Sequence, residues 1–106
     1  MSADRLTDAE IRPAEQYVSV LDFVSRCAQA IDTGDWFYLD DKASELEGAA
    51  SRLTDIAGET CREIRAGGPQ PRTQAMRAAV AHLGRHCHAG WLLHPEQPHP
   101  RGGERR

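Results

Sequence analysis

Potential metal ligands gather near the end of the chain, at His82, His86, Cys87 and His88. His82 and His86 are four residues apart, so on a helix both imidazoles project from one face and could reach the same transition-metal ion. Asp55, on an earlier predicted helix, is the candidate carboxylate ligand. The segment contains neither an HExxH motif nor paired CxxC motifs. We therefore expect no metal or other cofactor. His82, His86 and Asp55 are kept as weak candidates for metal ligands.

The segment Arg77-Ala-Ala-Val-Ala-His82 separates an arginine from a histidine by four residues. In this spacing it resembles the Arg-x4-6-His pattern of the HEPN helical ribonucleases, which are small all-α proteins. The resemblance implies that Arg77 and His82 flank an RNA phosphate and activate the 2′-hydroxyl for attack. It supplies the alternative hypothesis of a catalytic or ligand-binding protein that uses the His/Arg cluster of the third helix.

Two runs of large apolar residues lie far apart in the sequence. They are Trp36, Phe37, Tyr38 and Leu39 in the first half and Trp91, Leu92 and Leu93 near the end. In an up-down-up bundle the first turn and the end of the third helix share one pole, so we expect the two runs to meet. Trp and Tyr supply many binding hot spots. The pattern predicts a protein-binding or self-association patch, and the alternative is a small core that closes one end of the bundle.

Apolar spacing predicts the helices that carry these groups. Two series advance in alternating steps of three and four residues, which is typical of one helix face. They are Tyr17, Leu21, Val24, Ala28 and Ile31, and then Ala43, Leu46, Ala50, Leu53, Ala57, Thr60 and Ile64. Matched across a turn at residue 37, they predict antiparallel helices over 13–32 and 41–66. A third series, beginning at Met76, predicts a helix over 72–93 that packs against the second.

Small residues of the second helix are expected to face large residues of the first. Ala43, Ala50 and Ala57 recur every seven residues, opposite Ile31, Val24 and Tyr17 in this register. Small side chains against large ones allow a close approach of two helices. The substitution Ala50→Leu is therefore predicted to overpack the contact at a cost of about 1–3 kcal/mol.

Capping signals suggest where the helices begin and end. Thr7-Asp-Ala-Glu10 fits a capping box, and Pro13 suits the first turn of the main helix. Gly34 is placed for a left-handed C-cap, and Asp40 or Asp41 for the next N-cap. The predicted fold is an all-α, antiparallel up-down-up three-helix bundle over 13–94. A short N-terminal arm over 1–12 precedes it, and a disordered Pro/Gly/Arg tail over 95–106 follows.

Composition restricts the partners that the chain could bind. The net charge is −3, with 13 acids and 5 bases in residues 1–60 but 3 acids and 8 bases in residues 61–106. We expect no nucleic-acid partner on this basis, because the acidic helices would repel phosphates. No segment is apolar over the roughly 20 residues that a bilayer span needs, and the N-terminal residues lack the apolar region of a secretory signal. We expect a cytoplasmic protein.

These features favour a non-enzymatic interaction or regulatory module over an enzyme. The predicted core is rich in alanine and small, and association into a larger bundle would bury more apolar surface. We therefore expect a protein partner or a homodimer, bound through the aromatic patch.

Overall fold

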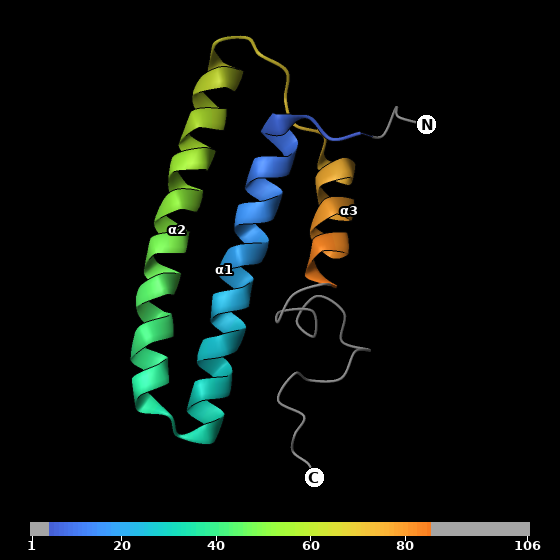
Figure 1. The fold of residues 1–106 in the computed structure, drawn as a ribbon. Coiled ribbons are helices and arrows are strands. Elements are labelled where there is room, and N and C mark those ends of the chain that lie inside the picture. Colours follow the sequence, from blue (N-terminus) through green and yellow to red (C-terminus); the bar gives the residue numbers. More distant parts are fainter. Residues whose placement is uncertain (1–4, 86–106) are drawn as a thin grey trace.

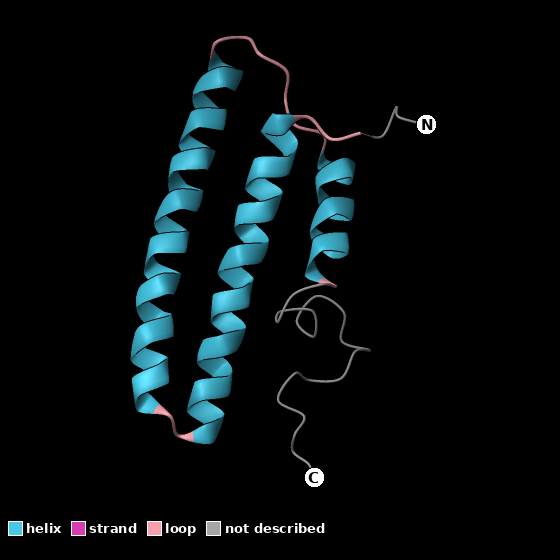
Figure 2. Cartoon of the chain, in the orientation of Figure 1, coloured by secondary structure: helices cyan, strands magenta, loops and turns pink. Residues whose placement is uncertain are grey.

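The computed structural model describes residues 5–85, and this part of the chain is entirely helical apart from short connections. Its helices are α1 (Asp8–Thr33), α2 (Trp36–Arg65) and α3 (Thr73–Gly84). Figure 1 shows that α1 and α3 run in one direction and α2 in the other. The predicted all-α, up-down-up arrangement is confirmed, and Figure 2 shows the two loops that join the helices.

The order of the helices across the molecule differs from the prediction. α1 lies in the middle and packs against both α2 and α3 (Figure 1), whereas α2 and α3 make only marginal contact. The expected packing of the third helix on the second is therefore wrong. The reason is at the start of α3, where Arg72 is bonded to Glu10 in the first turn of α1. This contact draws α3 to the far side of α1.

The three helices form a single layer. The described chain measures 52 × 31 × 15 Å, and one helix with its side chains is about 10–12 Å across. The radius of gyration is 16.0 Å, where a compact domain of this length would have about 12 Å. Each helix therefore exposes two broad sides, and α1 alone has a neighbour on both edges.

α1 begins five residues earlier than the predicted helix and passes through Pro13 without ending. The capping box is confirmed: the backbone N–H of Thr7 donates to Oε1 of Glu10 at 3.0 Å. Because Glu10 is also fixed by Arg72, the first turn is held firmly enough to continue into the proline. The segment predicted to be an arm thus contains the first turn of α1.

The hairpin turn is shorter than predicted, since only Gly34 and Asp35 separate α1 from α2. Gly34 has φ +71°, which confirms the left-handed C-cap. The predicted caps Asp40 and Asp41 are wrong: Asp35 caps α2, and its carboxylate accepts a hydrogen bond from the backbone N–H of Tyr38 at 3.0 Å. The aromatic run is therefore the first turn of α2 instead of a loop.

The shorter turn changes the register of the hairpin. The predicted register places residue 58 opposite Gln16, but Nε2 of Gln16 donates to the carbonyl of Ala49 at 3.0 Å. Nine residues of helix, about 13 Å, separate these two positions, and no glutamine side chain reaches that far. The prediction failed because it centred the hairpin on residue 37.

Burial shows which predicted core residues face the neighbouring helix. Among the described residues, the buried apolar side chains are Ala14, Val18, Ala30, Ala49 and Ala79. Leu46 and Leu53 are half-buried as expected, but Ala50 is exposed and its neighbour Ala49 has no exposed surface. Three of the five residues in the first predicted series and three of the seven in the second are therefore exposed. The predicted cost of Ala50→Leu does not apply within one chain.

The second and third helices differ from their predicted bounds by small amounts. α2 ends at Arg65, followed by a left-handed Gly67 at φ +93°, and α3 begins at Thr73. α3 extends to Gly84, and the remainder of the predicted third helix lies outside the described residues. The predicted tail over 95–106 also lies outside them.

Candidate interaction surface

The aromatic start of α2 combines two exposed and two half-buried side chains. Phe37 is 91% exposed and Trp36 is 67% exposed, whereas Tyr38 and Leu39 are half-buried. Placing an aromatic side chain in water is unfavourable, so consecutive exposed aromatics are typical of a binding surface. Trp91, Leu92 and Leu93 lie outside the described residues, so the predicted meeting of the two runs stays a prediction.

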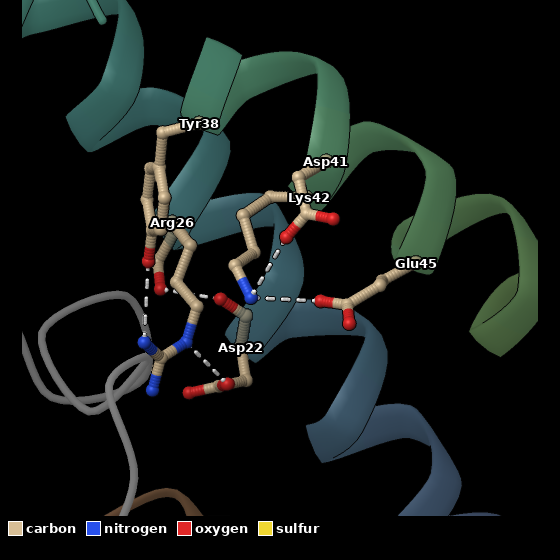
Figure 3. Close-up of polar contacts among 7 residues, drawn as sticks. Asp22, Arg26, Tyr38, Asp41, Lys42 and Glu45 are labelled. Carbon is tan, nitrogen blue, oxygen red and sulfur yellow. Dashed lines mark hydrogen bonds and ion pairs between the residues drawn. The ribbon is translucent and has the colours of Figure 1, made fainter.

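A polar network fixes Tyr38 and orients the start of α2 against α1 (Figure 3). Nε of Arg26 donates to Asp22 at 2.8 Å, and Nη1 of Arg26 donates to the Tyr38 hydroxyl at 3.4 Å. These hydrogen bonds, the one to Asp22 first, raise the pKa of Arg26. Lys42 lies 5.4 Å from the centre of the Tyr38 ring, within the range of a cation–π contact. Tyr38 is thus held in place by α1 and exposes only part of its side chain.

The same network continues along α2. Nζ of Lys42 bonds Glu45 at 2.9 Å and lies 3.5 Å from a carboxylate oxygen of Asp41 (Figure 3). The hydrogen bond to Glu45 is the main cause of a raised pKa for Lys42. These charged groups form one edge of the α1–α2 contact.

A second ion pair lies further along the hairpin, on the same edge of the α1–α2 contact. Arg12 of α1 bonds Glu59 of α2 at 3.1 Å. Each helical residue advances by about 100° around the axis, so Arg12 and Arg26 lie about 40° and 80° to one side of Gln16. Glu59 lies about 80° to one side of Ala49 on α2. Because Arg12 bonds Glu59, the side of α1 that carries Arg12 and Arg26 and the side of α2 that carries Glu59 belong to the same broad side of the layer.

The other broad side of the hairpin is apolar. Tyr17, Val24 and Ile31 lie about 60–100° from Gln16 in the direction away from Arg12 and Arg26. On α2, a row of alanines lies about 80–120° around the helix axis from Ala49, in the direction away from Glu59. We call this side the apolar face, and its two rows are Tyr17, Val24 and Ile31 on α1 and Ala43, Ala50 and Ala57 on α2.

All six residues of these rows are exposed, including Ile31 at 58%, Tyr17 at 41% and Val24 at 38%. The sequence predicted this apolar pattern but assigned it to the hairpin interior. The heptad spacing of the rows was the available signal, since residues seven apart share a face whatever covers that face.

An ion pair between the buried Glu10 and the partly exposed Arg72 fixes the start of α3 against α1. Glu10 is only 3% exposed, and its carboxylate accepts hydrogen bonds from Nε and Nη2 of Arg72 at 2.8 and 2.7 Å. The backbone N–H of Arg72 donates to the same carboxylate at 2.9 Å, and Nη2 also donates to the carbonyl of Arg5. The Arg72 guanidinium, with help from the backbone N–H groups of Thr7 and Arg72, holds the pKa of Glu10 far below its ordinary value. Sequence reasoning assigned Glu10 to the capping box and did not find its partner.

The structure places Arg77 and His82 in separate grooves beside α3. Arg77 lines one with Tyr17 and Met76, and His82 lines another with Leu6 and Ile11. The two side chains of the HEPN-like segment thus line different grooves on α3.

The metal candidates are not brought together by the described residues. Asp55 lies on α2, across α1 from His82, and His86 lies outside the described range. Within residues 5–85, no three His, Cys, Asp or Glu side chains cluster closely enough to hold a metal ion.

None of the three helices, taken over the described residues, is long and apolar enough to cross a membrane. No family model matches the sequence, and neither the curated proteins nor the solved structures include one that is significantly similar to it.

Proposed function

We propose that this chain is a small, non-enzymatic helical interaction module that associates with itself or with a partner protein. The observation that carries the proposal is the exposure of Trp36 and Phe37 at the tip of the hairpin. Together with Ile31, they place three large apolar side chains on the surface within one turn of the chain reversal. Hot spots of protein interfaces are enriched in such aromatic groups.

The thin fold supports the same proposal. Domains normally bury their apolar surfaces between at least two layers of helices or sheets, and the described residues form a single layer. The buried apolar side chains are almost all alanine, so the interior contributes little apolar burial. A partner that covers one side of the layer would supply the missing contacts.

Sedimentation velocity of the reduced protein tests the role of the aromatic tip. The double substitution Trp36→Ala/Phe37→Ala is expected to weaken association of the chain with itself or with a partner protein. His82→Ala is the matched control, because this residue lies on α3, away from the tip. Loss of association in His82→Ala, with the double variant unchanged, would contradict the proposal and favour the catalytic or metal-binding alternative.

A further inference from the structure

The apolar face is the uncharged broad side of the hairpin, and at Tyr17 it borders the groove that α3 lines. Across positions 17, 20, 24, 27 and 31 of α1 and 43, 46, 50, 53 and 57 of α2 there is no charged residue. The opposite side of the same two helices carries the ion pairs of Arg12, Arg26 and Lys42. A hairpin that is charged on one side and uncharged on the other requires a partner only on the uncharged side.

We propose that the occupant of the apolar face is a second copy of this chain. The inference rests on the proposed function and specifies its partner and its surface. In this dimer the apolar faces of two hairpins pack together, with α1 of one copy lying over α2 of the other. The two-fold axis runs parallel to the helices and lies between the two hairpins, over the line midway between α1 and α2.

The two rows of the face are complementary in size. The α1 row presents large side chains at Tyr17, Val24 and Ile31, and the α2 row presents only alanine. A two-fold axis brings each row against the other row of the partner, twice in each dimer. A single surface thus supplies both the projecting side chains and the space that receives them.

The observed register also fits this packing. The Gln16–Ala49 hydrogen bond places Val24 near the level of residue 41 and Tyr17 near the level of residue 48. Because the proposed axis preserves height along the helices, each large side chain lies within about two residues of an alanine of the partner's α2 row, Val24 near Ala43 and Tyr17 near Ala50. Ile31 falls beside the partner's Trp36 at the rim.

The area of the face sets the strength expected of the dimer. The two rows each span about 14 residues, roughly 21 Å, and two packed helices are about 20 Å wide, so the rows cover about 400 Å² on each copy. Contact along the whole α1–α2 overlap, at most the 26 residues of α1, would raise this to about 800 Å², the area of a standard protein interface. In the dimer α1 and α2 of both copies form a four-helix core of two layers, with α3 on the outside.

Sedimentation equilibrium of the reduced full chain tests the proposal with Val24→Asp and Ser44→Asp. Val24→Asp buries two unpaired carboxylates in the dimer, so we expect a dissociation constant at least about 100-fold higher than that of the wild type. Ser44→Asp is the control, because it adds the same charge at an exposed position of α2 outside the two rows. We expect this variant to remain a dimer.

The fold of each variant is checked by its helical circular dichroism. A folded Val24→Asp variant that dimerises as tightly as the wild type would overturn the proposed face. If Trp36→Ala/Phe37→Ala dissociates while Val24→Asp remains a dimer, the aromatic tip is the interface, and the interaction module stands while this face does not. A wild-type chain that is monomeric at every concentration would overturn the second copy as the occupant. Ala50→Leu supplies an independent test, since it adds bulk where Tyr17 of the second copy packs and should weaken the dimer at least about tenfold.

Discussion

Ala49 and Ala50 are adjacent in the sequence, yet the structure assigns them opposite sensitivities to enlargement. Ala49 has no exposed surface and its carbonyl accepts the hydrogen bond of Gln16. Ala50 is exposed on the apolar face. Substituting leucine at each position adds the same three carbon atoms to the same helix, so helix propensity cancels in the comparison.

Ala49→Leu is expected to destabilise the folded chain by about 1–3 kcal/mol, because the added carbons must displace α1 or leave their preferred rotamers. For a domain of this size, 1 kcal/mol lowers Tm by about 4–8 °C. The expected loss is therefore between about 4 and 24 °C in a thermal melt followed by circular dichroism, and it should be present at every protein concentration.

Ala50→Leu should change Tm by no more than about 2 °C in dilute protein, as a surface substitution does. Any larger loss should appear only at concentrations where the wild type is dimeric. The reasoning fails if Ala49→Leu melts within about 2 °C of the wild type, or if Ala50→Leu is the more damaging change in dilute protein.

Two further predictions concern backbone conformation and pH. Gly34→Ala should lower the free energy of unfolding by about 1 kcal/mol, because φ at Gly34 is +71°. Gly48→Ala should raise it by about 0.5–1 kcal/mol, because the new Cβ meets only the Arg52 side chain, at 3.8 Å. Urea unfolding of both variants checks these opposite signs. Glu10 has a pKa lowered in the folded chain by Arg72, so its contribution is complete above its ordinary value of 4.5 and is lost as the pH falls below it. The difference in Tm between the wild type and Glu10→Gln should thus shrink from pH 7 to pH 3. As a control, Glu59→Gln removes an exposed ion pair and should lower Tm little at either pH. A difference for Glu10→Gln that stays constant would contradict the proposed role of Glu10.

The sequence was sufficient to predict the helices and their directions. Apolar steps of three and four residues require helices, and the glycines at 34, 67 and 68 separate them whatever the packing. The capping box at Thr7 and the left-handed Gly34 were predicted for the same reason, since both depend only on neighbouring residues.

The arrangement of the helices was not predictable from the same pattern. Periodicity identifies apolar positions, but it does not say whether Val24 faces α2, α3 or another molecule. The buried partner of Glu10 is 62 residues away, and no local signal links it to Arg72. The predicted register was wrong because Asp35, one residue after Gly34, caps α2, so that the aromatic run belongs to the helix and not to the turn.

We propose that the chain is an interaction module whose partner includes a second copy of itself. The mass of the reduced wild-type protein, measured by sedimentation equilibrium over a series of concentrations, tests this proposal. A dimer of twice the 11.7 kDa chain mass is expected, dissociating on dilution to a folded or partly folded monomer. A mass of 11.7 kDa at every concentration, with a stable helical fold, would overturn the self-association.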